Sequence, residues 1–224
     1  MLQKKIIVIG GGAGGMLFAA LAARPGTQVT IVEKNEKLGK KLFITGKGRC
    51  NFTNRCDSGE FLKHVVSNSR FLYSAVSRFS PEDLIALFES WGLKTKTERG
   101  RRMFPASDKS SDVIDVLKSA LRKNGVKVML HTKALDIITS EEGVTGIRAM
   151  KDGEEFFLPA DRIVVASGGL SYPSTGSDGD GYRFAEKTGH RITKLYPSLV
   201  PIVCREESVR RMQGLSLKNV ERVV

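Results

Sequence analysis

Three glycines near the N-terminus have the spacing of a dinucleotide-binding loop. Gly10, Gly12 and Gly15 stand in the G-x-G-x-x-G register, with Ala13 and Gly14 between the last two. In that register the first glycine permits a tight turn, the second lets a pyrophosphate approach the backbone, and the third lets helix and strand pack closely. A helix that begins here directs its free amides and the positive end of its dipole at the phosphates. The predicted ligand is therefore an adenine dinucleotide.

A carboxylate follows at the distance expected for the ribose of that dinucleotide. Glu33 ends a second apolar segment, residues 28–32. It lies about 20 residues beyond the glycines, where an acidic side chain accepts hydrogen bonds from the adenosine ribose hydroxyls. This carboxylate would repel a 2′-phosphate, which disfavours NADP and leaves FAD or NAD. The alternative is a structural glycine turn with Glu33 as a solvated strand end.

A polar, glycine-rich segment offers a second group of candidate ligands. Residues 46–54 read GKGRCNFTN and predict a loop with special backbone angles and many hydrogen-bond donors. Loops positioned by a rigid sheet often meet ligands, and this one could lie along the pyrophosphate and the flavin ring of a cofactor. The alternative is a turn whose asparagines satisfy their own backbone. Lysines just before the loop are candidates for the cofactor phosphates. The contacts predicted from this part of the chain are Lys40, Lys41, Arg49, Cys50, Asn51 and Thr53.

The strands and helices predicted around these residues indicate an α/β fold. Residues 4–9 are a short, continuous, β-branched run, typical of a strand buried on both faces of a parallel sheet, and a helix is predicted over 16–23. Further helices are predicted over 61–79, from the N-cap Ser80 to Gly92, from Ser110 or Ser111 to Gly125, and over 182–188. Strands are predicted at 126–130, 134–139, 144–150 and 155–158, forming a small antiparallel meander, and at 161–166 as a returning buried strand.

The composition indicates a soluble globular protein. The 224 residues are 41% hydrophobic, enough for the core of one large or two small domains, and no run approaches the roughly 20 apolar residues of a membrane helix. The N-terminus reads as a strand rather than a signal sequence, so the predicted compartment is the cytoplasm. The net charge of +12 raises the question of nucleic acid. Because the basic residues are dispersed and no RNA- or DNA-binding motif accompanies them, a nucleic-acid partner is not expected.

Other reactive side chains lack the partner residues that a metal site or acid–base catalysis requires. The three cysteines are an odd number without C-x-x-C spacing, which argues against a disulfide framework and a structural zinc site. Asp178 and Asp180 lack the remaining ligands of a calcium loop, so no metal is predicted. His190 follows a helix-ending glycine and is a weak candidate for a proton donor. No side chain is identified as a catalytic base.

Several motifs together resemble one family of bacterial flavoproteins. IVIGGGAGG at residues 7–15, VEKNEKLGKK at 32–41 and ITGKGRCNFTN at 44–54 resemble NAD(P)/FAD-dependent oxidoreductases, the "aminoacetone oxidase family" of HI0933-like flavoproteins. Later segments agree, including GRRMFPAS at 100–107 and GSDGDGY at 176–182. The resemblance implies a Rossmann-like fold of the two-dinucleotide-binding-domain type, with FAD bound in extended form.

The resemblance also implies further cofactor contacts. In such flavoproteins the meander crosses over the nucleotide half, the backbone near Ala134 touches the adenine, and a strand ending in ASGG returns to the cofactor. Side chains of the loop 170–181, among them Ser171, Tyr172 and Thr175, are expected to reach the flavin or the substrate. The contacts carried over to this chain are Lys34, Ala134, Ala166, Ser167 and Gly168.

The C-terminal residues predict a second domain. Residues 1–200 are expected to be the first, incomplete part of the FAD-binding domain, and 201–224, with a strand at 215–220, the start of an inserted substrate-side domain. By the resemblance the chain covers the N-terminal half of a family member. It is then expected to bind FAD weakly or not at all, and to associate through its uncovered face.

The predicted function is that of an FAD-dependent oxidoreductase, or its N-terminal part. Hydride transfer would belong to the flavin, with NAD(P)H as a possible reductant and an unknown small molecule as substrate. The alternative is a non-catalytic adenine-dinucleotide-binding module with a basic surface for a partner. Specific RNA modification is a third hypothesis, which rests on fold analogy and charge alone.

Overall fold

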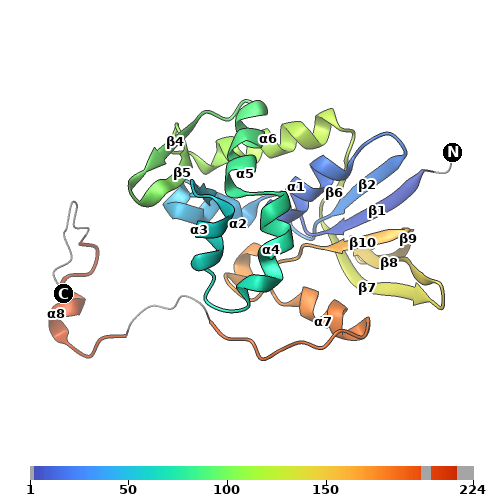
Figure 1. Ribbon diagram of the computed structural model, residues 1–224. Helices are drawn as coiled ribbons and strands as arrows, with labels where there is room; N and C mark the ends of the chain where they lie inside the picture. The colour runs from blue at the N-terminus through green and yellow to red at the C-terminus, as the bar shows by residue number, and fades with distance from the viewer. Residues whose placement is uncertain (1–2, 198–202, 216–224) are drawn as a thin grey trace. The chain divides into compact units, whose positions relative to one another are not determined.

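The apolar run at the N-terminus forms an inner strand of a parallel sheet. A computed structural model describes residues 3–197 and 203–215. In it β1 (Lys4–Ile9) lies between β2 (Thr27–Val32) and β10 (Arg162–Val165), and β6 (Lys127–Met129) pairs with β2. The strand order is β10-β1-β2-β6, and all three pairings are parallel. In Figure 1 the blue strands β1 and β2 accordingly lie beside the orange β10.

Two helices cover one face of this sheet. α1 (Ala13–Ala22) and α6 (Ser110–Lys123) share one core with the inward side chains Val8, Val29 and Ile31. Apolar residues of α6 recur at three- and four-residue intervals, as an amphipathic helix requires. The buried side chains that α6 contributes to the core are Val113, Leu117, Ala120 and Leu121.

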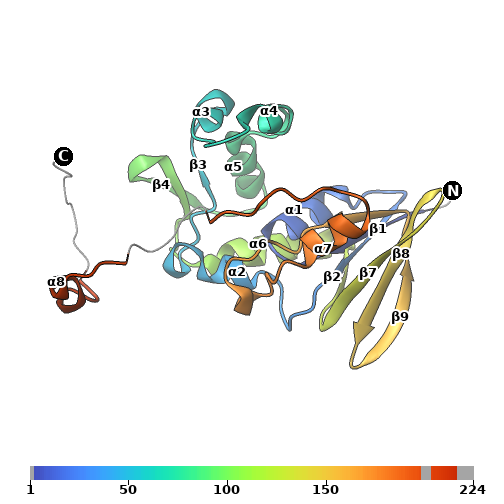
Figure 2. The same ribbon diagram turned by 90° about the horizontal axis from the view of Figure 1, so that it is seen from below.

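A three-stranded antiparallel sheet covers the opposite face. It consists of β7 (Thr132–Ser140), β8 (Gly143–Lys151) and β9 (Glu154–Pro159), which Figure 2 shows in yellow beside β1 and β2. Its inner side chains and Phe184 of α7 (Asp180–Lys187) enclose Ile7 and Ile9. Neighbouring residues of β1 therefore point into different cores, which is why the strand reads as continuously apolar. The predicted α/β, Rossmann-like fold with a small antiparallel meander is confirmed.

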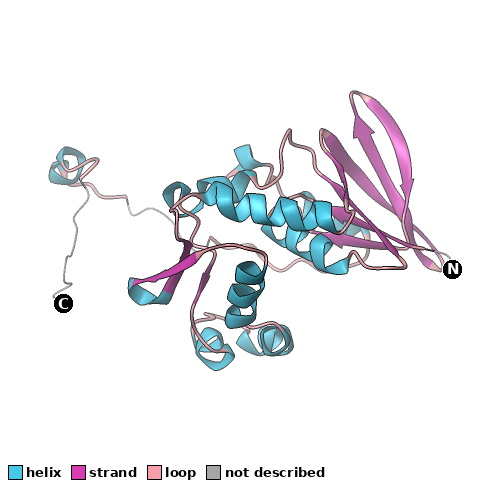
Figure 3. Ribbon diagram, turned by 90° about the horizontal axis from the view of Figure 1, so that it is seen from above, coloured by secondary structure: helices cyan, strands magenta, loops and turns pink. Residues whose placement is uncertain are grey.

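The chain between β2 and α6 forms a smaller sheet and the four α-helices α2 to α5. Figure 3 shows this sheet apart from the other two, next to the helices. The helix bounds are α3 Ser58–Lys63, α4 Ser69–Arg78 and α5 Pro81–Ser90, and the strand bounds are β3 Thr53–Asn54, β4 Thr95–Glu98 and β5 Arg102–Pro105. A capping box between Ser80 and Asp83 starts α5, as the sequence predicts. α2 (Lys40–Ile44) precedes the small sheet.

Two predictions about these elements are wrong. Residues 61–79 are not one helix, because α3 ends at Lys63 and α4 begins at Ser69 after Asn68, whose φ of 54° is left-handed. Residues 126–130 are not part of the antiparallel meander, since β6 pairs with β2 in parallel. A strand that follows a crossover helix returns parallel to its partner, and α6 is such a helix.

The chain divides into two compact units, Met1–Arg191 and Ile192–Val224. In the second unit α8 spans Glu207–Arg211. The predicted strand at 215–220 falls outside the described residues, apart from Leu215, and so does the predicted domain boundary at 200. Within the described ranges, no helix has the length and apolar character needed to cross a membrane.

Candidate functional site

A pocket of about 290 Å³ opens where β1, β2 and β10 end. The carboxyl ends of parallel strands are where open α/β sheets bind their ligands. The glycine loop after β1 forms one wall, the segment after β2 a second, and the segments after β10 and around the start of β7 complete the lining. The predicted site residues among the lining are Gly10, Gly12, Ala13, Gly14, Glu33, Lys34, Lys40, Lys41, Ala134, Ala166, Ser167 and Gly168.

Two glycines of the loop are required by the protein's own packing. Gly10 has a φ of 107°, and a Cβ atom on it would lie 2.5 Å from the carbonyl oxygen of Ala166. A Cβ on Gly15 would overlap the carbonyl oxygen of Gly10. These are the roles that the spacing assigns to the first and third glycines, a tight turn and close packing between helix and strand. Gly15 itself is buried and does not line the pocket.

Two other glycines face open space. A Cβ atom on Gly12 or Gly14 would meet nothing within 4 Å, yet both residues line the pocket. Gly12 precedes α1, whose first amides have no partner within the helix. This wall therefore offers bare backbone and the positive end of a helix dipole, a surface that fits a pyrophosphate.

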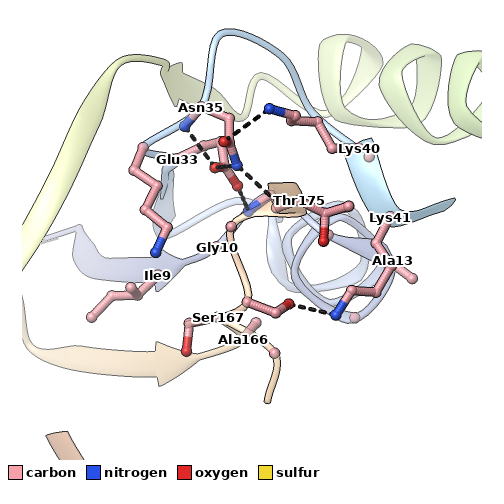
Figure 4. A pocket seen from close by; sticks show the side chains of 18 of the residues that line it. Ile9, Gly10, Ala13, Glu33, Asn35, Lys40, Lys41, Ala166, Ser167 and Thr175 are labelled. Carbon is pink, nitrogen blue, oxygen red and sulfur yellow. Dashed lines mark hydrogen bonds between the residues drawn. The ribbon is translucent and has the colours of Figure 1, made fainter. Parts of the chain in front are cut away.

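The carboxylate of Glu33 is buried at the end of β2, with 7% of the residue exposed. Its Oε2 accepts a hydrogen bond of 2.7 Å from the Gly11 amide. Its Oε1 accepts 2.8 Å and 2.6 Å bonds from the backbone and side-chain amides of Asn35 (Figure 4). The alternative of a solvated strand end is wrong. Neither Gly11 nor Asn35 is among the residues predicted from the sequence.

Two lysines after β2, Lys34 and Lys41, reach the segment that leads into α7, whereas Lys40 contacts Asn35 on its own side of the pocket. Lys34 Nζ lies 2.6 Å from Asp178 and 3.2 Å from Asp180. Lys41 Nζ donates a 2.5 Å hydrogen bond to Ser177 Oγ, and Lys40 Nζ donates one to Asn35 Oδ1 (Figure 4). Lys34 and Lys40 are paired with carboxylates, so the positive charge that best suits an anionic ligand is that of Lys41, whose partner is the neutral Ser177 hydroxyl.

The segment that ends β10 contributes an unsatisfied polar atom. Ser167 Oγ is buried and has no hydrogen-bond partner within the described part of the chain. Such orphaned buried hydroxyls are rare because an unmade hydrogen bond is costly. Ser167 lines the pocket beside Gly168, but its Oγ lies on the side of Gly181 in α7, where a Cβ would be 2.8 Å away. The bare wall at Gly12 and the carboxylate of Glu33 are the features that make the pocket fit a dinucleotide cofactor.

The GKGRCNFTN loop lies outside this lining. The guanidinium of Arg49 pairs with Glu98 and Asp108 and lies over the ring of Phe104, 4.3 Å from its centroid. Cys50 is fully buried, and burial raises the pKa of its thiol. The predicted special backbone is present, with a φ of 58° at Lys47 and 59° at Cys50. Contacts of Arg49, Cys50, Asn51 and Thr53 with a flavin remain predictions.

Charge pairing keeps the carboxylates around Arg49 ionised. A hydrogen bond from Arg49 lowers the pKa of Glu98. Hydrogen bonds from Lys96 and then Arg49 lower the pKa of Asp108. The network joins the glycine-rich loop to β4 and to the turn after β5, so its first role is to hold this loop in place.

Several residues that line the pocket cannot be identified from the spacing of residues in the sequence. Of the three side chains expected from the loop 170–181, only Thr175 lines the pocket. His190 does not line it and contacts Thr188 Oγ1 through Nδ1 at 3.2 Å. Among the described residues, no group of three or more His, Cys, Asp or Glu side chains could hold a metal ion. The lining residues that were not predicted include Gly11, Asn35, Lys37, Thr132, Lys133, Gly176, Ser177 and Asp180.

Comparison with known sequences gives a family match and two close relatives. The family model described as HI0933-like protein Rossmann domain matches residues 4–223. A 3-dehydro-bile acid delta(4,6)-reductase of Clostridium scindens is 36% identical over 220 residues, covering 95% of this chain and 51% of that protein. A ribosomal RNA dihydrouridine synthase of Escherichia coli is 31% identical over 211 residues, covering 94% and 50%. The chain thus spans about half the length of these curated relatives.

Solved structures show the same fold. A 3-ketosteroid delta1-dehydrogenase from Sterolibacterium denitrificans superimposes with a TM-score of 0.63 at 18% identity, covering 84% of this chain and 56% of that one. The similarity covers most of this chain at low sequence identity. It therefore supports the architecture described above.

Proposed function

The chain belongs to the HI0933-like family of FAD-binding Rossmann-domain flavoproteins, and we propose that it forms the FAD-binding part of a reductase that acts on a carbon–carbon double bond. The observation that carries the proposal is the pocket at the carboxyl ends of β1, β2 and β10. There a bare glycine wall, the fixed carboxylate of Glu33 and the ammonium group of Lys41 line one space.

The lining residues divide the work of binding. The loop from Gly10 to Gly14 would receive the pyrophosphate, with Lys41 adding positive charge from the side of Ser177. Glu33 would accept a hydrogen bond from the adenosine ribose. Ala134, which is 5% exposed and lies where β7 enters the pocket, would contact the adenine. Bound FAD supplies hydride transfer, whereas the protein supplies binding, orientation and electrostatics.

The names of the two relatives suggest the class of substrate. A delta(4,6)-reductase and a dihydrouridine synthase both add two hydrogen atoms across a carbon–carbon double bond. Their substrates differ greatly in size, one a bile acid and the other ribosomal RNA. The shared chemistry supports reduction of such a double bond, while the substrate of this protein is left to experiment. NADH or NADPH is the proposed source of electrons.

Anaerobic absorbance spectroscopy tests this proposal. The purified protein is loaded with FAD and titrated with NADH or NADPH, and we expect the flavin band to bleach. Addition of a conjugated steroid enone or of unmodified ribosomal RNA in separate cuvettes should then restore the band in one of them. A protein that binds adenine dinucleotides but never shows flavin reduction would instead support the non-catalytic module.

A further inference from the structure

The side chain of Asn35 makes three hydrogen bonds beside the carboxylate of Glu33. Its side-chain amide directs its two hydrogens to Glu33 Oε1, at 2.6 Å, and to the carbonyl oxygen of Thr175, at 3.2 Å. Its Oδ1 accepts a hydrogen bond of 3.3 Å from Lys40 Nζ. The NH₂ group therefore meets two acceptors and the oxygen meets a donor, which fixes the orientation of the amide. Figure 4 shows Asn35 between Glu33, Lys40 and Thr175.

The backbone of Asn35 completes this arrangement. Its amide donates a second hydrogen bond to Glu33 Oε1, at 2.8 Å, and its carbonyl accepts one from the His131 amide at 3.1 Å. Asn35 thus links the end of β2 to the segment that leads into β7 and to the loop after β10. No other residue type of this size supplies a donor and an acceptor in the same plane.

These contacts determine which oxygen of Glu33 is free. A carboxylate oxygen has two lone-pair sites, and both sites of Oε1 are occupied by Asn35. Oε2 receives one bond, from Gly11, so one acceptor site remains on it. A side chain on Gly11 would collide with Leu38 and come within 3.2 Å of Oε2, so glycine is what lets that amide and the carboxylate meet.

We propose that Asn35 is a positioning residue for the bound nucleotide: it holds Oε1 of Glu33 so that Oε2 alone is presented to one ribose hydroxyl. This inference rests on the proposed nucleotide site and adds a determinant of its ribose recognition. Because the two carboxylate oxygens are made unequal, recognition of one hydroxyl should dominate over the other. Loss of a hydrogen bond to a charged group corresponds to about a tenfold or larger change in affinity.

Calorimetric titration with ADP, 2′-deoxy-ADP and 3′-deoxy-ADP measures this recognition without a flavin or a reaction. The wild-type protein should bind ADP about tenfold more tightly than one of the two deoxy analogues. Asn35→Ala should bind ADP more weakly and reduce this preference to about twofold or less. Asn35→Asp should be the weakest binder, because it places a second carboxylate against Glu33 in place of a donor.

The order of the variants separates positioning from simple packing. If Asn35 only filled space, the isosteric Asn35→Asp would bind ADP nearly as well as wild type, and Asn35→Ala would be the worse variant. The matched control is Asn124→Ala, which removes an amide bond of 2.8 Å to the Ala20 carbonyl outside the pocket. This control should keep the wild-type ribose preference.

The outcomes also separate this inference from the proposed function. A protein that binds ADP with a ribose preference, but takes up no FAD, would refute the proposed flavoprotein and leave the role of Asn35 standing. A protein that binds FAD, but whose ribose preference is unchanged in Asn35→Ala, would refute the role of Asn35 alone. Absence of binding to both FAD and ADP would overturn both.

Discussion

Lys41 and Ser177 are 136 residues apart in the chain and are joined by a hydrogen bond of 2.5 Å from Nζ to Oγ. The bond connects the first turn of α2 to the loop before α7. Ser177 is only 5% exposed. Its Oγ packs so closely against Gly168 that a Cβ atom on this glycine would lie only 2.5 Å from it. An ammonium group is thereby held in the lining of the pocket beside Gly168, where it would favour an anionic ligand.

Removing this ammonium should weaken FAD binding. We expect Lys41→Ala to raise the dissociation constant for FAD about tenfold, or about 1.4 kcal/mol, and to make binding less sensitive to salt. Fluorescence titration at low and high ionic strength measures both effects. Ser177→Ala is the matched variant, because it removes the hydrogen bond and keeps the charge, and its effect should be smaller. Equal effects of the two variants would show that the bond, rather than the charge, matters.

Substitution of Gly12 should separate binding from folding. Gly12 has a φ of −81° and a ψ of −169°, angles that any residue adopts, and a Cβ there meets nothing in the protein. Gly12→Val should therefore unfold at nearly the wild-type urea concentration yet lose FAD binding by at least about tenfold, since its side chain fills the space of the pyrophosphate. Unimpaired FAD binding by a folded Gly12→Val protein would place the pyrophosphate elsewhere.

Substitution of Gly15 should lower the stability of the protein, unlike substitution of Gly12. A methyl group here overlaps the Gly10 carbonyl, so the helix and strand must move apart. We expect Gly15→Ala to lose about 1–3 kcal/mol of unfolding free energy in urea, the usual cost of overpacking. Gly59→Ala, on the exposed surface of α3, should keep or slightly raise stability, because alanine favours helix over glycine. A stable Gly15→Ala protein would contradict the close contact.

The ion pairs around Arg49 should affect how the stability of the protein changes at acidic pH. The pKa of Glu98 is lowered by Arg49, so the stability from this pairing is fully present above the unfolded pKa, near 4.5, and is lost as the pH falls through the lower folded value. Arg49→Gln should therefore be less stable at pH 7 and lose less further stability below pH of about 4.5. Urea midpoints measured between neutral and acidic pH give both slopes. Parallel curves for variant and wild type would exclude this pairing.

Thiol reactivity should distinguish the three cysteines. Burial raises the pKa values of Cys50 and Cys56, which are 0% and 8% exposed, whereas Cys204 is exposed. Since the thiolate is the reactive form, an aromatic disulfide reagent should titrate one fast thiol in the folded protein and three in urea. Cys204→Ser should remove the fast phase. Rapid reaction of Cys50 would show that the glycine-rich loop opens readily.

Sequence reasoning located the parts of the site that depend on local spacing. Gly10, Gly12 and Glu33 lie on one βαβ unit, where the order of strand, turn and helix restricts their positions to a few residues. Ala134 and the Ala166–Gly168 segment came from the family resemblance rather than from their own pattern. All of them line the pocket.

The remaining parts depend on pairings that spacing does not encode. Ser177 and Asp180 lie in the segment 170–181, which is rich in Gly, Asp and Ser. This composition predicts a loop, but it does not indicate that the segment lines the pocket. Arg49 has the chemistry of a phosphate ligand, but its partners Glu98 and Asp108 are 49 and 59 residues away. The break between α3 and α4 did have a local signal, since Ser67 and Asn68 are turn residues, but the apolar periodicity on either side obscured it.

The pairing of β1 with β10 has a consequence for synthesis of the protein. Ile6 is aligned with Arg162, so β1 is synthesised about 150 residues before the strand that pairs with one of its edges. Such long-range pairings close large loops and slow folding. The pocket needs Asp180 as well as Gly10, so a nascent chain can assemble it only after nearly all of the first unit has left the ribosome. Cofactor binding therefore has to wait until the segment through Asp180 has been made.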